Sequence, residues 1–142
     1  MATLISHSPA ETEAFGERYA ASAHSGLVIG LCGDLGAGKT QLVKGFARGL
    51  GISARVHSPT FALINAYEGG RLPLFHIDLY RLETPQQIDS AGLQEYLQPE
   101  GVTMIEWADR WFGDPAPPGV KIIHLEVVSE NERRLIYEDP GA

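Results

Sequence analysis

The residues best suited to chemistry form the segment 33–40, Gly-Asp-Leu-Gly-Ala-Gly-Lys-Thr, which fits the pattern G-x-x-x-x-G-K-[ST]. In such a loop the glycines allow backbone N–H groups to point at a β-phosphate. Lys39 would reach the β- and γ-phosphates, and the hydroxyl of Thr40 would hold Mg²⁺. The alternative is a chance match in a chain rich in glycine and alanine. The flanking residues favour the first interpretation, a site for a nucleoside triphosphate.

A phosphate-binding loop has to lie between a strand and a helix, and both are predicted here. The apolar run 27–32, Leu-Val-Ile-Gly-Leu-Cys, is typical of a buried strand. The start of the following helix adds roughly half a positive charge beside the phosphates. We expect Lys39 to begin a solvent-facing turn, so that its loss would leave folding intact. The helix is predicted over 41–50, ends at Gly51, and has one apolar face: Leu42, Val43, Phe46, Ala47 and Leu50.

Two acidic residues follow apolar strands and are candidates for magnesium binding and catalysis. The strand 74–78, Leu-Phe-His-Ile-Asp, ends in Asp78, and the buried run 102–105 is followed by Glu106. Enzymes with a phosphate loop need an acidic group at a strand end to hold the Mg²⁺ shell. The alternative for each is an ordinary exposed carboxylate at the end of a strand. We predict that Asp78 and Glu106 act in catalysis and that both, with Thr40, face the metal.

The segment 56–61, Val-His-Ser-Pro-Thr-Phe, lies between the predicted helix and the next strand. In nucleotide switches, a loop bearing hydroxyl groups folds over the γ-phosphate at this place. Ser58 and Thr60 could act in this way, with Pro59 stiffening the segment. A plain turn that leads into a strand explains the same residue types equally well.

The remaining pattern predicts an α/β fold with a mixed, partly antiparallel central sheet. Apolar runs separated by glycine-rich or polar turns are typical of hairpins, and a capping box is typical of a helix start. The expected elements are a helix that opens at Ser8 with Glu11 completing its capping box, a hairpin of 60–67 with 72–77, a short helix over 85–91, a turn over 93–97, and a final hairpin of 121–128 with 134–137.

Size and charge limit the possible functions. At 142 residues, the chain is predicted to form a single domain over 1–142. No segment reaches the roughly 20 apolar residues that cross a bilayer, no secretory leader is evident, and the single cysteine, Cys32, cannot form an internal disulfide. We therefore expect a cytoplasmic protein. The net charge of −7 argues against independent binding to DNA or RNA, so any RNA contact would come largely through a partner.

Motifs that the chain lacks argue against several classes of nucleotide-binding protein. The chain has no Asn-Lys-x-Asp, the usual guanine-reading element, and no Leu-Ser-Gly-Gly-Gln, which transporter ATPases carry. Residues 84–99 contain no arginine, although small nucleotide kinases carry a basic lid in such a region. The five histidines show no metal-ligand spacing, so we expect each to be a core or surface residue rather than a zinc ligand.

With these pieces in order, the chain resembles the bacterial TsaE family, formerly YjeE, the small ATPases of tRNA threonylcarbamoyladenosine synthesis. The resemblance covers nearly the whole chain. The chain departs from the family at Gln41, where many members have a second threonine. Besides the phosphate loop, the resemblance rests on residues 11–12 (Glu-Thr), 58–61 (Ser-Pro-Thr-Phe), 76–82 (His-Ile-Asp-Leu-Tyr-Arg-Leu), 92–96 (Gly-Leu-Gln-Glu-Tyr) and 105–110 (Ile-Glu-Trp-Ala-Asp-Arg).

The resemblance implies a P-loop NTPase-like three-layer fold and an Mg²⁺-dependent ATPase that acts with the proteins TsaB and TsaD. TsaD transfers the threonylcarbamoyl group to the adenosine beside the anticodon of ANN-decoding tRNAs, and ATP hydrolysis by the TsaE component resets the complex between turnovers. Thr12 and one arginine would flank the adenosine. The implied nucleotide contacts are Thr12, Gly33, Leu35, Gly36, Ala37, Gly38, Lys39, Thr40, Gln41, Thr60 and either Arg133 or Arg134.

Hypotheses from different classes remain open. The first is an accessory ATPase whose hydrolysis is tied to a protein assembly. The alternative is a small-molecule P-loop kinase, which needs an acceptor pocket and a basic lid that excludes water. A third is a nucleotide-gated binding module that hydrolyses ATP negligibly. ATP turnover measured alone and with partner proteins would separate them.

Overall fold

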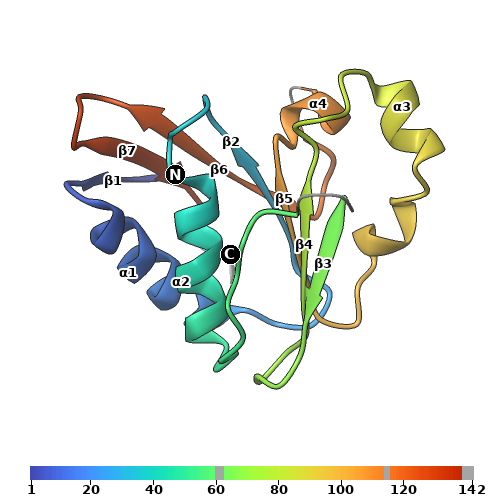
Figure 1. Cartoon of the computed structure of the whole chain (residues 1–142), viewed down its shortest axis with the longest axis horizontal. Coiled ribbons are helices and arrows are strands. Elements are labelled where there is room, and N and C mark those ends of the chain that lie inside the picture. Colours follow the sequence, from blue (N-terminus) through green and yellow to red (C-terminus); the bar gives the residue numbers. More distant parts are fainter. Residues whose placement is uncertain (60–62, 114–115, 139–142) are drawn as a thin grey trace.

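The central element of the molecule is a seven-stranded sheet with the strand order β1-β7-β6-β2-β5-β4-β3 (Figure 1). The computed structural model describes residues 1–59, 63–113 and 116–138. Its strands are Ala2–Ser6 (β1), Val28–Cys32 (β2), Ile64–Tyr67 (β3), Leu74–Asp78 (β4), Val102–Glu106 (β5), Val120–Val127 (β6) and Arg133–Tyr137 (β7). Its helices are Pro9–Tyr19 (α1), Lys39–Gly49 (α2), Pro85–Ser90 (α3) and Asp109–Phe112 (α4), with short 3₁₀ helices at Ala20–Ser22 (η1) and Gln94–Leu97 (η2). Over the described residues, none of these helices has the length and apolar content that a membrane crossing requires.

The sheet is mixed because its centre is parallel and its edges are antiparallel. Strands β6, β2, β5 and β4 run parallel to one another. β3 pairs with β4 and β7 pairs with β6 as antiparallel hairpins, which confirms both predicted hairpins, and β1 pairs antiparallel with β7. The parallel centre brings the carboxyl ends of β2, β4 and β5 to one edge of the sheet. Ligands bind at this edge in open α/β sheets.

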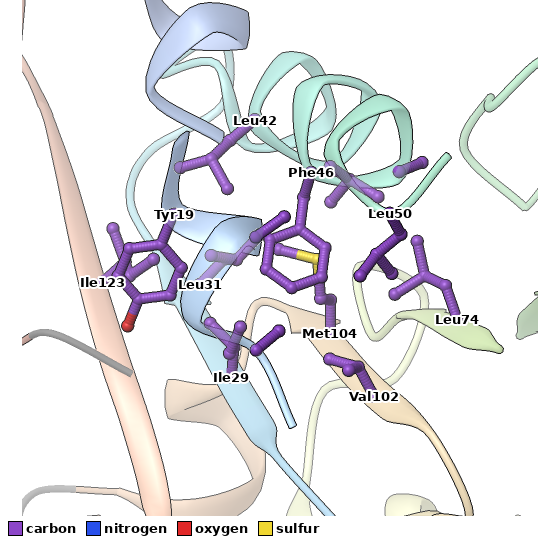
Figure 2. Close-up of a cluster of buried hydrophobic side chains, with 14 of the residues drawn as sticks. Tyr19, Ile29, Leu31, Leu42, Phe46, Leu50, Leu74, Val102, Met104 and Ile123 are labelled. Carbon is purple, nitrogen blue, oxygen red and sulfur yellow. The ribbon is translucent and has the colours of Figure 1, made fainter. Parts of the chain in front are cut away.

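Helices cover both faces of the sheet, which gives three layers (Figure 1). On one face Ile29 and Met104 of the strands pack against Phe46 of α2 (Figure 2). On the other face Val28 packs in a second cluster with Ile88 of α3. Val28 and Ile29 face opposite sides because successive residues of a strand alternate. The predicted three-layer, P-loop NTPase-like α/β fold is therefore confirmed.

Glycines bring α1 and α2 close together. A Cβ atom added at Gly45 would lie 1.8 Å from the backbone oxygen of Glu13, and one added at Gly16 would lie 2.4 Å from the backbone oxygen of Leu42. Larger residues at these positions would force the two helices apart. The close packing also brings α1 beside the phosphate loop, since a Cβ added at Gly38 would lie 3.6 Å from Cγ2 of Thr12.

The elements differ from prediction mainly at their ends. The helix after the phosphate loop begins at Lys39 rather than at residue 41, and β4 begins at Leu74 rather than at 72. Residues 60–62 of the predicted strand 60–67 lie outside the described residues, and β3 begins at Ile64. Ser8 caps α1 as predicted, because its side chain accepts the N–H of Glu11. Glu11 does not complete the predicted capping box, because its carboxylate accepts the backbone N–H of His7 at 2.6 Å rather than that of Ser8. β1 and α4 are additions that the sequence pattern does not predict.

Candidate functional site

A cavity of about 460 Å³ lies at the carboxyl ends of β4 and β5, beside the start of α2. It is built from segments that are far apart in the sequence. The predicted site residues that line it are Thr12, Leu35, Gly36, Gly38, Lys39, Thr40, Gln41, Asp78, Glu106 and Arg133. The other lining residues are Ser8, Pro9, Ser58, Tyr80, Trp107, Glu130 and Asn131. The predicted contacts that do not line it are Gly33, Ala37 and Arg134, and Thr60 lies outside the described residues.

The loop between β2 and α2 has the shape that its glycines allow. Gly36 and Gly38 have φ angles of 82° and 100°, in the left-handed region that other residues rarely adopt. The N–H of Ala37 donates to the backbone oxygen of Asp34 at 3.0 Å, which closes the turn. α2 begins directly after Gly38. Because the first N–H groups of a helix have no acceptor within it, this end of α2 is suited to bind an anion.

Lys39 is folded back over its own loop. Its Nζ atom donates to the backbone oxygens of Gly33 at 2.6 Å and Asp34 at 2.9 Å. Only 5% of the residue is exposed, so the expectation that it begins a solvent-facing turn is wrong. Burial lowers the pKa of the Lys39 ammonium, and the nearby carboxylates, Glu106 foremost, act in the opposite direction. The lysine therefore rests on weak acceptors that a phosphate group would displace.

Trp107 closes one side of the cavity in a strained conformation. Its φ angle of 62° is the one positive value among the described residues other than glycine. Two cations lie close to its indole, with Lys39 Nζ 4.0 Å and Arg110 Cζ 4.7 Å from the ring centroid. The ring of Tyr80 lies 5.4 Å away. Strain of this kind is typical of functional sites, and here it places an aromatic face against the phosphate-loop lysine.

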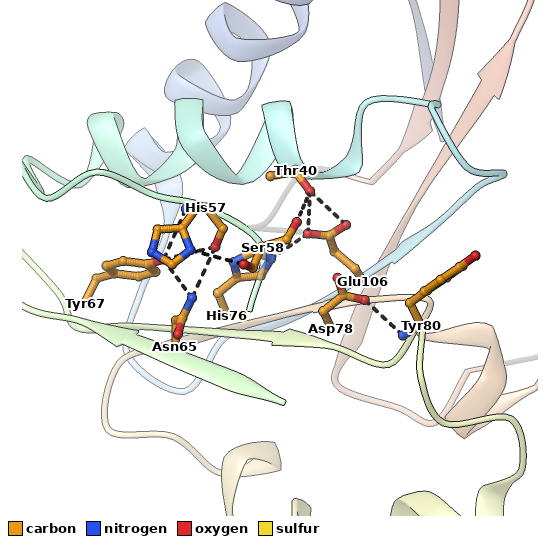
Figure 3. Close-up of polar contacts among 9 residues, drawn as sticks. All are labelled: Thr40, His57, Ser58, Asn65, Tyr67, His76, Asp78, Tyr80 and Glu106. Carbon is orange, nitrogen blue, oxygen red and sulfur yellow. Dashed lines mark hydrogen bonds and ion pairs between the residues drawn. The ribbon is translucent and has the colours of Figure 1, made fainter. Parts of the chain in front are cut away.

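The side chains of Thr40, Glu106 and Ser58 form a continuous chain of hydrogen bonds (Figure 3). The Thr40 hydroxyl donates to the Glu106 carboxylate, at 3.0 Å to Oε2 and 3.2 Å to Oε1. Because Thr40 has a single proton, the Ser58 hydroxyl is the donor in the 2.9 Å contact between Ser58 Oγ and Thr40 Oγ1. Thr40 Oγ1 therefore accepts one hydrogen bond from Ser58 and has one further lone pair at this point of the cavity.

The loop that carries Ser58 is held from β3. The side-chain amide of Asn65 donates to the backbone oxygen of His57 at 3.2 Å. The N–H of His57 donates to the hydroxyl oxygen of Tyr67 at 3.3 Å. Figure 3 shows Asn65 and Tyr67 beneath this loop, with Ser58 directed toward Thr40. The first strand of the hairpin thus supports the loop on the phosphate-loop helix.

Asp78 and Glu106 are register partners at the ends of neighbouring parallel strands. The backbone N–H of Tyr80 donates to Asp78 Oδ1 at 3.0 Å. Desolvation raises the pKa of the Asp78 carboxyl above its ordinary value of 3.8, and the charge of Glu106 adds to the rise. Glu106 itself is buried, with 3% exposed. The cavity is lined by three acidic side chains, with Glu130 as the third, and by two basic ones, Lys39 and Arg133, so a cation would neutralise the remaining negative charge.

The oxygen groups of this site fit Mg²⁺. This ion takes oxygen ligands, keeps several waters, and is held by one or two carboxylates together with phosphate oxygens. The Thr40 hydroxyl and the carboxylates of Glu106 and Asp78 offer that set at the end of the phosphate loop. In the described part of the chain, no group of three or more His, Cys, Asp or Glu side chains could hold a metal ion by itself. The site therefore fits a metal that arrives with phosphate oxygens.

Comparison with known proteins identifies the family. The family model described as "Threonylcarbamoyl adenosine biosynthesis protein TsaE" matches residues 6–136. The chain belongs to the TsaE family. It is 50% identical over 133 residues to the tRNA threonylcarbamoyladenosine biosynthesis protein TsaE of Bacillus subtilis, covering 94% of this chain and 82% of that protein. It is 38% identical to the protein of the same name in Treponema pallidum, covering 92% and 96% of the two chains.

A solved structure is similar over nearly the whole chain. The crystal structure of Bacillus subtilis YdiB matches with a TM-score of 0.79 and 38% sequence identity. The match covers 96% of this chain and 83% of YdiB. The fold of this TsaE-family chain is therefore shared with an experimentally determined structure.

Within this family member, the geometry separates the two candidate arginines. Arg133 lines the cavity, and its Nη2 atom donates to the backbone oxygen of Gly36 in the phosphate loop at 3.2 Å. Arg134 instead pairs with Glu126 at 2.8 Å, because neighbouring residues of β7 face opposite sides of the sheet. Of the two arginines, Arg133 is therefore the one that lines the cavity beside the loop 33–40.

Thr12 joins the site from α1. It is 2% exposed, its hydroxyl lies 2.7 Å from Ser6 Oγ, and it lines the cavity. Ser6 belongs to β1, the edge strand that the sequence pattern does not predict. The N-terminal strand thus helps to fix the position of Thr12 at the cavity wall.

His76 is a buried polar residue beside the cavity to which sequence reasoning did not assign a role. It is fully buried, with 0% exposed, and its Nε2 atom lies 2.6 Å from Glu106 Oε2. The sequence analysis expected a core or surface histidine; the structure places His76 in the core, and the contact with Glu106 was not expected. A signal was available in the strand pattern, because His76 lies two residues before Asp78 and must share its face of β4. A polar residue at an inward position next to a candidate catalytic acid is expected to contact that acid or its partner.

Proposed function

We propose that this protein is an ATP-binding and ATP-hydrolysing accessory component in the formation of N6-threonylcarbamoyladenosine in ANN-decoding tRNAs. Its ATP hydrolysis supports turnover of an assembly of TsaB and TsaD, and it meets tRNA through that assembly, in the cytoplasm. The observation that carries the ATPase proposal is the contact of Thr40 with Glu106 at the mouth of the phosphate loop. Relatives named as tRNA threonylcarbamoyladenosine biosynthesis proteins support the pathway.

In this proposal the phosphate loop and the start of α2 bind the phosphates. The backbone N–H groups after Gly36 and the Lys39 ammonium bind the β- and γ-phosphates. The Thr40 hydroxyl donates its hydrogen bond to Glu106 and accepts one from Ser58, which leaves one lone pair on Thr40 Oγ1. Thr40 and Glu106 would therefore hold Mg²⁺ together. The bound ion would neutralise charge that develops on the phosphate oxygens.

Asp78 supplies the second acidic group. It faces the cavity beside Glu106 and accepts a backbone N–H from Tyr80, which fixes its orientation. A pKa above the ordinary carboxyl value makes Asp78 a better proton acceptor. We assign it to orient the attacking water and accept its hydrogen bond, with the metal shell as its second contact. Thr12 and Arg133 bound the side of the cavity assigned to the adenosine.

The alternative, a small-molecule kinase, needs a basic lid over the phosphates, and region 84–99 does not provide one. The arginine-free region 84–99 contains α3 and η2. Its Ile88 and Leu93 pack in the hydrophobic cluster on the face opposite α1 and α2. No residue of this region is among those that line the cavity. It offers no basic lid over the phosphates, so we retain the accessory ATPase.

The test is ATP turnover by the purified protein alone, with TsaB and TsaD, and with small-molecule acceptors. The accessory role predicts stimulation by the two proteins and none by acceptors. Glu106→Gln should lower turnover by about 100-fold or more while nucleotide still binds. Glu100→Gln, at an exposed position at the amino end of β5, is the matched control. If Glu106→Gln hydrolyses ATP at the wild-type rate, Glu106 is an ordinary carboxylate at a strand end without a catalytic role. Phosphorylation of a small-molecule acceptor would favour the kinase.

A further inference from the structure

The contact between His76 and Glu106 is the shortest polar contact of the carboxylate that the proposed function assigns to the metal. His76 Nε2 lies 2.6 Å from Glu106 Oε2, whereas Thr40 Oγ1 lies 3.0 Å from the same oxygen. Both residues of the pair are buried, with 0% of His76 and 3% of Glu106 exposed. A buried carboxylate needs hydrogen-bond donors in place of water, and these two side chains provide them.

The chemistry of the pair fixes which atom donates. An ionised carboxylate only accepts hydrogen bonds, so His76 Nε2 carries the proton. The other ring nitrogen, Nδ1, has no hydrogen-bond partner within the described part of the chain. The orientation of the imidazole is therefore set by Glu106 on one side and by packing on the other.

The strand register explains how the imidazole reaches Glu106. His76 pairs with Met104 and Asp78 pairs with Glu106 on β4 and β5, so His76 lies one same-face position before the acidic pair. Its side chain reaches diagonally to the neighbouring strand, beneath Thr40 (Figure 3). Glu106 is thereby held from two sides, by α2 through Thr40 and by β4 through His76.

We propose that His76 is a positioning residue whose Nε2–H holds the Glu106 carboxylate against the Thr40 hydroxyl, so that both present oxygen to a magnesium-bound nucleotide. This inference rests on the proposed function. Hydrogen bonds to metal-ligating groups orient them, and their loss costs about 10- to 100-fold in metal affinity. Without the His76 donor, the buried Glu106 would turn toward other donors or solvent and leave Thr40.

The test compares two amides that differ in reach. In His76→Gln the amide nitrogen falls near the position of the imidazole Nε2, so it can still donate to Glu106. In His76→Asn the amide nitrogen falls near Nδ1, short of Glu106. Thr103→Val is the matched control, because Thr103 is buried in the adjacent strand and its hydroxyl has no partner among the described residues. Thermal unfolding of each variant checks that it folds.

The measurement is the affinity for Mn²⁺, used as the probe for the metal, in the presence of a non-hydrolysable ATP analogue. Free Mn²⁺ is followed by electron paramagnetic resonance, and analogue binding without a divalent metal is measured by calorimetry. We expect His76→Asn to weaken Mn²⁺ binding by about 10- to 100-fold, and His76→Gln and Thr103→Val to stay within about threefold of the wild type. Binding of the metal-free analogue should be unchanged in all three.

Each other outcome has a separate meaning. Equal Mn²⁺ affinity in His76→Asn and the wild type overturns the positioning role and leaves the ATPase proposal standing. Equal losses in the Asn and Gln variants also overturn it, since the donor would not be what matters. Failure of the wild type to bind Mn²⁺ with the analogue would instead defeat the proposed function. If the Asn variant does not fold, a long-range ¹H–¹⁵N spectrum of the wild type decides, because a proton on Nδ1 and none on Nε2 contradicts the proposal.

Discussion

Among single residues, Lys39 would have to exchange several contacts when a phosphate enters the cavity. Its Nζ atom rests on two backbone oxygens of its own loop and on the face of Trp107. A phosphate offers full negative charge in place of these neutral acceptors, and charge-assisted hydrogen bonds are about twice as strong as neutral ones. We therefore expect the ammonium to leave the Trp107 face on nucleotide binding.

Lys39→Met tests this assignment while keeping an unbranched side chain in the buried site. Loss of the charge should weaken ATP binding by at least about 2 kcal/mol, or roughly thirtyfold, as measured by calorimetry. The fluorescence of Trp107 should change when Mg²⁺-ATP is added to the wild type and should change little in the variant. Trp111→Phe is the control, since Trp111 stacks on Phe112 at 5.0 Å and is not among the residues that line the cavity. Unchanged ATP affinity in Lys39→Met would contradict the assignment of residues 33–40 as a phosphate-binding loop.

At Asp78 we expect stability and function to have opposite requirements, because the ionised carboxylate that the proposed function needs lowers the stability of the folded protein. Its folded pKa lies above the ordinary value of 3.8, so the folded protein holds this proton more tightly than the unfolded chain does. The resulting stabilisation is present at low pH and is lost as the pH rises through the folded pKa. At neutral pH, Asp78→Asn should therefore raise the free energy of unfolding, by about 1 kcal/mol or less because the group is partly exposed.

The measurement is thermal or urea unfolding of the wild type and Asp78→Asn across pH. The gain should shrink as the pH falls through the folded pKa and below the ordinary value of 3.8, because a protonated Asp78 is as neutral as the amide that replaces it. ATP turnover of the same variant should fall even though its stability rises. Glu100→Gln, exposed at the other end of the sheet, should show neither effect. A variant less stable than the wild type at neutral pH would mean that the Asp78 charge is stabilised by its surroundings.

At the scale of elements, the packing of α1 on α2 fixes Thr12 beside the phosphate loop. Gly45→Ala would place a methyl group 1.8 Å from the backbone oxygen of Glu13, which no side-chain rotation relieves. We expect a loss of about 2–3 kcal/mol in the free energy of unfolding, despite the better helix propensity of alanine. Urea denaturation measures it, with Lys44→Ala at the preceding, half-exposed position of α2 as the control. A stabilised Gly45→Ala would show that α1 can move away from α2 at little cost.

The elements also show what the sequence can and cannot predict. The phosphate loop, both hairpins and the two acidic strand ends are local patterns, so the residues themselves specify them. β1 was not predictable because a five-residue edge strand with mixed polarity acquires its structure from pairing with β7 at the far end of the chain. The buried position of Lys39 and the contact of His76 with Glu106 likewise depend on neighbours in space. The same holds for Arg133, since only the register of β7 distinguishes it from Arg134.

At the scale of the whole molecule, the fold connects the proposed nucleotide site to a loop whose position a protein partner would detect. The loop that carries Ser58 is held on β3 and contacts the oxygen of Thr40 that is assigned to the metal. Metal binding and the Ser58 hydrogen bond compete for the space around that oxygen. The position of this loop is therefore expected to differ between the ATP-bound and ADP-bound protein, as in other nucleotide switches. With a net charge of −7, the chain is not expected to bind tRNA by itself. We therefore expect a protein partner to respond to the position of this loop.

We predict that this TsaE-family protein binds an assembly of TsaB and TsaD differently in its ATP and ADP states. Pull-downs with ATP, with ADP and with no nucleotide measure the difference. Ser58→Ala removes one hydrogen bond of about 1 kcal/mol, so it should reduce the ATP-to-ADP ratio of retained partner by about fivefold and change ATP affinity less. Thr103→Val, buried away from the loop, should leave the ratio unchanged. Equal retention of TsaB and TsaD in all three nucleotide conditions would show that partner binding does not depend on the nucleotide. The kinase hypothesis would then be open again, because ATP hydrolysis would have no effect on the assembly.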